Sequence, residues 1–314
     1  MSETQTAYPL TPEPQPLRTM LLLFGFIMLG AMLASGVSAL LIGAVAKVSG
    51  IPGDIKTLLQ NPASLSHGWW LMMSVQLLNQ AGLFLLPTLL HWFINEKRRL
   101  ADFNGQPVGQ VMGWGLVILL TISLMPVNSL IIGLNQALTL PDSLAPLERW
   151  IRAKEDQMAE LTKFLTTFRT VPQLAMAMLT IAVMPALSEE VLFRGVLQRK
   201  FIVWTGSIHA GIWLAAALFS AIHLQFYGFV PRMLLGALFG YLYVWSGNLW
   251  VPMLAHFVNN GFTIFLIFLY NRRLTSINID STGSVPLPVV LVGALVTTTA
   301  LVLFKRMNTN KRNV

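Results

Sequence analysis

The chain of 314 residues contains no cysteine and few charged residues. The absence of cysteine excludes disulfide bonds, thiolate metal sites and a cysteine nucleophile. Only 11% of the residues are charged, against about 25% in soluble domains, whereas 54% are hydrophobic. The net charge of +8 comes without a dense basic run, so nothing in it indicates nucleic-acid binding. This composition excludes most soluble classes and indicates an integral membrane protein.

Several apolar runs are long enough to cross a bilayer, which takes about 20 mostly apolar residues for one helix. Residues 1–16 are polar and proline-rich, and they predict a mobile tail ahead of the first run. The pattern predicts an all-α fold, a polytopic transmembrane helical bundle of about eight spans, at residues 19–45, 69–94, 109–135, 172–199, 206–224, 228–246, 250–270 and 285–305.

The long connection at 137–170 has a helical pattern of its own. Its apolar residues recur at helical spacing, and charged residues fill the other faces. This pattern predicts an amphipathic helix that either lies on the membrane surface or forms a soluble cap. The apolar positions are Leu147, Trp150, Ile151, Met158, Leu161 and Leu165.

Two adjacent glutamates, Glu189 and Glu190, stand inside the apolar run at 172–199, whereas the other eleven of the thirteen acidic residues lie in polar segments. A charged side chain at the bilayer centre costs at least about 2.5 kcal/mol, so such residues are rare unless paired or functional. On a helix Glu190 and Arg194 share a face and can pair, whereas Glu189 has no local cation. The pattern fits a supporting ion pair beside a general base, or a structural ion network that fixes helix packing.

Two later apolar runs carry further polar groups. His223 closes the run at 206–224, where a histidine can also be a simple interfacial residue. His256 and Asn260 are four residues apart in the run at 250–270, so they share one helix face. Such a pair can donate hydrogen bonds to an oxyanion, and its imidazole can bind a metal, but it can also join two helices.

Together the three clusters supply a base, a histidine that polarises water and donors for an oxyanion. That set suits the attack of water on a peptide carbonyl. No HExxH signature of a zinc protease is present. His223 lies late in its run and His256 early in another, so a shared site requires short or tilted helices or a deep cavity in mid-membrane.

The three motifs resemble those of the CPBP family of intramembrane proteases, which includes the type II CAAX prenyl endopeptidases and the bacterial Abi, or bacteriocin-immunity, proteins. The resemblance covers about residues 172–270. The motifs that carry it are Glu189-Glu190-x-x-x-Arg194, Phe219-x-x-x-His223 and His256-x-x-x-Asn260, with Phe193-Arg194-Gly195, Gly236 to Gly240, and Asn248-Leu249-Trp250-Val-Pro252 as context.

The resemblance implies a role for each matched residue. Glu189 matches the glutamate that activates water, with His223 assisting, and Glu190 and Arg194 match supporting positions. His256 and Asn260 match the oxyanion-stabilising pair. The resemblance leaves two options for the cofactor, either a divalent metal such as zinc held by Glu189, His223 and His256, or no metal.

The function expected from the sequence is hydrolysis of a peptide bond in a membrane-anchored protein or peptide. The expected partners are the lipid bilayer and this substrate, in a multi-pass protein of a bacterial plasma membrane. The expected regions are a tail at 1–16, N-terminal spans and the amphipathic helix at 17–170, a catalytic core at 171–272, and the last span with a basic tail at 273–314. An ion-coupled transporter and a non-catalytic membrane scaffold are the alternatives, although no inverted repeat is visible.

Overall fold

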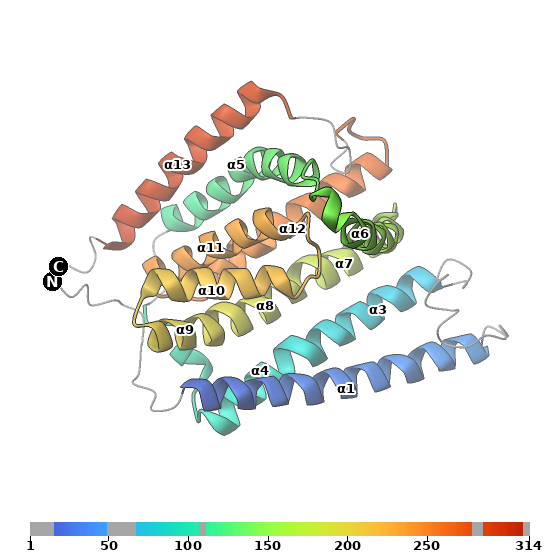
Figure 1. Ribbon diagram of the computed structural model, residues 1–314, viewed down its shortest axis with the longest axis horizontal. Coiled ribbons are helices and arrows are strands. Elements are labelled where there is room, and N and C mark those ends of the chain that lie inside the picture. Colours follow the sequence, from blue (N-terminus) through green and yellow to red (C-terminus); the bar gives the residue numbers. More distant parts are fainter. Residues whose placement is uncertain (1–15, 49–66, 107–110, 278–284, 310–314) are drawn as a thin grey trace.

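The computed structural model describes residues 16–48, 67–106, 111–277 and 285–309, and all regular secondary structure in these ranges is helical (Figure 1). The expected all-α bundle is therefore confirmed. The longer elements are α1 (Pro16–Val48), α3 (Gly68–Gln80), α5 (Val111–Gln136), α6 (Ala145–Thr166), α10 (Ile208–Ala221), α11 (Phe229–Ser246), α12 (Trp250–Asn271) and α13 (Leu287–Thr309). The predicted tail falls outside the described residues, apart from Pro16, which begins α1.

Two long bent helices are built from shorter pieces. The first runs from α3 through η2 (Ala81–Leu85), α4 (Leu86–Leu90) and η3 (His91–Asn95). The second runs through α7 (Val171–Ala177), η6 (Met178–Val183), α8 (Met184–Glu190), η7 (Val191–Leu197) and α9 (Gln198–Thr205). The four η pieces named here are π-helical, a form that is frequent at functional sites. The short 3-10 helices η4 (Leu100–Phe103) and η5 (Asp142–Leu144) lie in connections.

Seven helices of the described chain are long and apolar enough to cross a membrane, namely Leu17–Val48, Gly68–Asn95, Val111–Gln136, Val171–Thr205, Phe229–Ser246, Trp250–Asn271 and Leu287–Thr309. The fifth expected span, 206–224, is corrected to the 14-residue helix α10. At a rise of about 1.5 Å per residue, 14 residues extend only about 21 Å, less than the ~30 Å hydrocarbon core. The chain is an integral membrane protein with seven candidate spans and one shorter apolar helix.

A tight reversal explains why α10 starts where it does. Gly206 adopts a left-handed conformation with φ of 65°, which glycine accepts without strain, and it ends α9. Ser207 then caps α10, because its side chain accepts a hydrogen bond from the backbone N–H of Ala210. The reversal lays α9 and α10 side by side, as Figure 1 shows.

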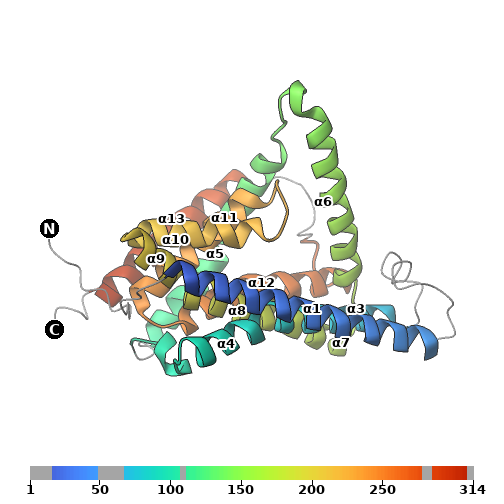
Figure 2. The same ribbon diagram turned by 60° about the horizontal axis from the view of Figure 1, so that its bottom comes forward.

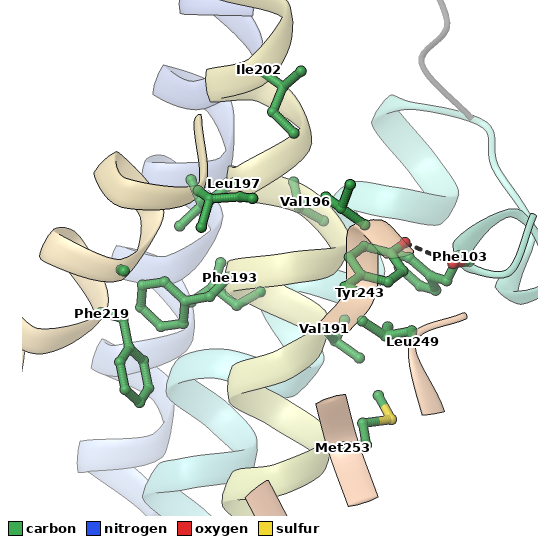
Figure 3. Packing of buried hydrophobic residues seen from close by; sticks show 14 of the residues in the cluster. Phe103, Val191, Phe193, Val196, Leu197, Ile202, Phe219, Tyr243, Leu249 and Met253 are labelled. Atoms are coloured by element: carbon green, nitrogen blue, oxygen red, sulfur yellow. Dashed lines mark hydrogen bonds between the residues drawn. The ribbon is translucent and has the colours of Figure 1, made fainter. Parts of the chain in front are cut away.

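The main core surrounds the π-helical turn η7 (Figure 3). Val191, Phe193 and Val196 are buried there with Phe219 of α10. The Tyr243 hydroxyl of α11 donates a 2.7 Å hydrogen bond to the carbonyl oxygen of Phe103 in this core. The segment that follows the two glutamates is therefore among the most enclosed parts of the described chain.

Helix α6 runs across the direction of the other helices and projects from the bundle (Figure 2). Its first turn contains Pro146. Proline suits this position, because the N–H groups of a first turn have no acceptor within the helix and proline has no N–H to leave unpaired. Leu147, Trp150 and Met158 are exposed on it, at 46%, 61% and 45% of their surface. The predicted amphipathic helix is present, and its position on the membrane surface stays a prediction.

Candidate active site

Glu189 and Glu190 end helix α8 and are almost fully enclosed. Their exposed fractions are 6% and 0%. The π-helical turn η7 begins at the next residue, Val191. Two carboxyl groups thus lie in the interior of a bundle whose neighbouring surfaces are mainly apolar, where each needs polar partners.

Glu190 lies at the centre of a buried network. Its Oε1 accepts a 2.8 Å hydrogen bond from Nη1 of Arg194 and another of 2.8 Å involving Nδ1 of His256. Because the Glu190 carboxylate is paired with a guanidinium and can only accept, Nδ1 of His256 carries a proton. The expected pair of Glu190 and Arg194 is confirmed. Glu190 also orients the imidazole of His256, and the local spacing did not indicate this contact.

Arg194 is enclosed by aromatic rings and is only 1% exposed. Its guanidinium carbon lies 4.8 Å from the ring centre of Phe219 and 5.5 Å from that of Phe239. Nη2 donates a 2.9 Å hydrogen bond to the carbonyl oxygen of Gly236 on α11. The cation is therefore bound by a carboxylate, a carbonyl and two ring faces, which compensates for its removal from water.

Glu189 faces the second nitrogen of the same imidazole. Its Oε2 lies 3.9 Å from Nε2 of His256. That separation is too long for a direct hydrogen bond, and a polar gap of this size can be bridged by a water molecule. The arrangement places Glu189 and His256 on two sides of one small polar region.

Gln80 of α3 completes the surroundings of Glu189. Its Nε2 donates a 2.6 Å hydrogen bond to Oε1 of Glu189 and contacts Oγ of Ser188 at 3.2 Å. Gln80 is itself buried, with 7% of its surface exposed. Sequence reasoning missed this residue, although an amide inside an apolar run is a signal that could have found it.

His223 lies in the turn after α10, outside the seven candidate spans. Its Nδ1 contacts the carbonyl oxygen of Phe219 at 2.8 Å, and because a carbonyl only accepts, Nδ1 bears the proton and Nε2 is left as an acceptor. Burial lowers the pKa of His223 to about 4, with the positive charge of Arg232 acting in the same direction. His223 is therefore neutral near pH 7, the state in which Nε2 can accept a proton or a hydrogen bond.

The ring of Phe219 links the two histidines. Its centre lies 5.1 Å from that of His223 and 6.2 Å from that of His256, and both contacts are edge-on. His223 follows the short helix α10 and His256 lies in the second turn of α12, so two different helices bring the histidines to one ring. The shortness of α10 fits one of the expected geometries, whereas the shared site and the mid-membrane cavity stay predictions.

Asn260 is bound to the backbone carbonyl of Ile181 in η6. Nδ2 of Asn260 donates a 2.9 Å hydrogen bond to that carbonyl. Its Oδ1 accepts from Nδ2 of Asn259 at 3.0 Å. Asn260 thus joins α12 to η6, and its expected oxyanion role stays a prediction that would use its second amide proton.

The turn that carries His223 is held by α6. Tyr227 in this turn is 3% exposed, and its backbone N–H donates a 2.9 Å hydrogen bond to the Glu155 carboxylate. The hydroxyl of Tyr227 donates to Glu148 at 3.1 Å. The Arg152 guanidinium lies 4.3 Å from the centre of its ring. Tyr227 is a second residue that the motifs did not indicate.

The residues proposed for a metal do not fit one. Within the described part of the chain, no group of three or more histidine, aspartate or glutamate side chains lies close enough together to hold a metal ion. Glu189, His223 and His256 are therefore not brought together as a three-ligand set. Nδ1 of His256 is already hydrogen-bonded to Glu190, and its Nε2 is 3.9 Å from Glu189.

Residues 171–262 match the family model described as Type II CAAX prenyl endopeptidase Rce1-like. The family resemblance is confirmed over this segment. The matched segment contains both glutamates, both histidines and Asn260, but it excludes Gln80 and α6.

A curated relative, the uncharacterized protein YpbD of Bacillus subtilis (strain 168), is 35% identical over 102 residues. That stretch is 31% of this chain and 47% of YpbD, so the chain spans about half the length of this relative. No solved structure matches the chain.

Proposed function

We propose that this protein is an intramembrane endopeptidase that hydrolyses a peptide bond of a membrane-anchored protein or peptide. The observation that carries the proposal is the buried Glu189, whose Oε2 faces His256 across a 3.9 Å gap inside the segment that matches the CAAX endopeptidase model. Glu189, His223, His256 and Asn260 are the proposed catalytic residues, supported by Glu190 and Arg194. A bacterial plasma membrane is the proposed location, which the match to a Bacillus protein supports.

The proposed reaction begins with a water molecule held between Glu189 and His223. Oε2 of Glu189 removes a proton as the water oxygen bonds to the peptide carbonyl carbon, and Nε2 of His223 accepts a hydrogen bond from the same water. Glu189 then transfers that proton to the amide nitrogen as the carbon–nitrogen bond breaks. Atoms and charge balance without any further reactant.

The carbonyl oxygen becomes an oxyanion during this attack. Nε2 of His256, when it bears a proton, and the second amide proton of Asn260 are the donors proposed to stabilise it. Glu190 holds the His256 ring from the opposite side through Nδ1, at 2.8 Å. Arg194 holds Glu190 in turn, which explains why this ion pair is buried beside the proposed base.

Cleavage of a membrane-anchored reporter peptide library by purified protein in nanodiscs tests the proposal. Glu189→Gln keeps the shape of the side chain but removes the base, and we expect cleavage to fall at least about 100-fold. Glu160→Gln, a matched change on the exposed surface of α6, is the control and should cleave at the wild-type rate.

Cleavage by Glu189→Gln at the wild-type rate would refute the mechanism. A biological phenotype that survives Glu189→Gln would favour a scaffold over an enzyme. Parallel reactions with and without a chelator show whether a metal takes part.

A further inference from the structure

Gln80 reaches Glu189 from a helix that lies far away in the sequence. It is the last residue of α3, and 109 positions separate it from Glu189. Its Nε2 contacts two successive residues of α8, Glu189 and Ser188. The 2.6 Å contact to Glu189 is the shorter of the two, as expected when the acceptor is a carboxylate.

The chemistry of the two groups fixes the orientation of the amide. An ionised carboxylate only accepts hydrogen bonds, so the NH₂ of Gln80, and not its oxygen, must face Oε1 of Glu189. Oε1 is therefore occupied by a donor that the fold supplies. Oε2 is the oxygen that faces His256, at 3.9 Å from Nε2.

We infer that Gln80 is a positioning residue of the proposed reaction. By binding Oε1 it fixes the carboxylate plane, and it leaves Oε2 as the single oxygen that takes the proton from water and returns it to the leaving nitrogen. The inference rests on the proposed function and deepens it, because it assigns proton transfer to one atom. It also makes α3, outside the matched segment, part of the catalytic apparatus.

Other charged groups act on Glu189 and stay in place when Gln80 is changed. Glu190 and Arg194 lie on its own bent helix, His256 on α12 and Arg232 on α11. Gln80 is the neutral donor among the partners of Glu189 in the described chain. Its replacement therefore removes one hydrogen bond and changes no charge.

Asn79 gives a matched control at the preceding position. It is also an amide in the same helix, but its Oδ1 accepts a 3.1 Å hydrogen bond from Ser38 of α1 and not from the glutamate pair. Gln80→Met keeps the length of the side chain and removes the donor. Asn79→Leu removes an interhelical hydrogen bond of a similar kind away from Glu189.

We expect Gln80→Met to lower kcat for reporter cleavage about 10- to 100-fold, because a hydrogen bond to a charged group is lost. KM should stay within about twofold, since Gln80 is not expected to touch the substrate. The acidic limb of the pH–rate profile should move to higher pH, because a carboxylate that has lost a donor holds its proton more tightly. Asn79→Leu should leave all three quantities within about twofold of wild type.

Infrared difference spectroscopy of the protonated carboxyl band gives a readout that needs no substrate. Glu189→Gln identifies the band of Glu189, and Gln80→Met should move its titration to higher pH. An unmoved band together with an unmoved pH–rate profile would overturn the inference. The inference is also overturned if Gln80→Met loses activity only in proportion to its loss of folded protein and Asn79→Leu does the same.

The two experiments separate this inference from the function on which it rests. If no reporter is cleaved but the Glu189 band moves in Gln80→Met, Gln80 controls this carboxylate and the protease function fails. If cleavage requires Glu189 but Gln80→Met resembles wild type, the protease function stands and Gln80 has no positioning role.

Discussion

The buried ion pair between Glu190 and Arg194 should show strong energetic coupling. The two side chains are 0% and 1% exposed and are joined at 2.8 Å. Arg194→Met leaves a carboxylate buried without its cation, and removing one partner of such a pair costs about 3–5 kcal/mol. Against a total stability of about 5–15 kcal/mol, this single change removes a large part of the stability of the fold.

A double-mutant cycle measures the coupling free energy between Glu190 and Arg194. Glu190→Gln keeps an oxygen for both Arg194 and His256 but leaves the guanidinium uncompensated, so we expect a loss of about 2–4 kcal/mol. The double variant leaves neither member of this pair as an unpaired buried charge, and its main loss is the donor to the Gly236 carbonyl, about 1–3 kcal/mol. The double variant should therefore be more stable than the sum of the single losses predicts, by at least about 2 kcal/mol.

Unfolding in mixed micelles of increasing SDS content, followed by tryptophan fluorescence, measures these differences. Arg272→Met is the control, because Arg272 also lies against a phenylalanine ring, Phe268 at 5.6 Å, but is exposed. It should change stability by less than about 1 kcal/mol. The reasoning is refuted if Arg194→Met costs no more than this control, or if the losses of the two single variants simply add.

Two further outcomes are expected. Asn260→Ala should lower stability by about 1–3 kcal/mol in the same unfolding assay, because it removes the hydrogen bond that joins α12 to the carbonyl of Ile181; an unchanged stability would contradict this role. His223 should stay neutral down to about pH 4 in NMR of histidine-labelled protein. Arg232→Met should raise the pKa of His223 only part of the way back to its ordinary value, because burial is the larger cause of the lowering. A His223 that titrates near its ordinary pKa would show that the turn is open to water.

The helical fold and one contact of the site, the Glu190–Arg194 pair, follow from simple sequence rules. Long apolar runs predicted the bundle, because a lipid environment leaves the helix as one of few ways to satisfy the backbone. The spacing of Glu190 and Arg194 predicted their pairing, since both lie on one helix. The contact of His256 with Glu190 joins two helices, and no local pattern contains it.

The features that the sequence did not predict depend on tertiary packing. Gln80 is an ordinary amide until α3 packs on α8, and Tyr227 is an ordinary aromatic residue until α6 covers its turn. Gly206 and Ser207 set the start of α10, close to the expected boundary, whereas its end at Ala221 falls before the expected end at 224. Asn260 matched a motif position, but its bond to Ile181 depends on how α12 packs against η6.

The contacts from α3 and α6 limit how the matched segment can be transplanted. A chimera that grafts residues 171–262 onto other N-terminal helices inherits the glutamates, the histidines and the asparagine. It loses the donor that Gln80 gives to Glu189 and the carboxylates that hold Tyr227. A working graft therefore has to carry two remote anchoring points along with the motifs, one on α3 and one on α6.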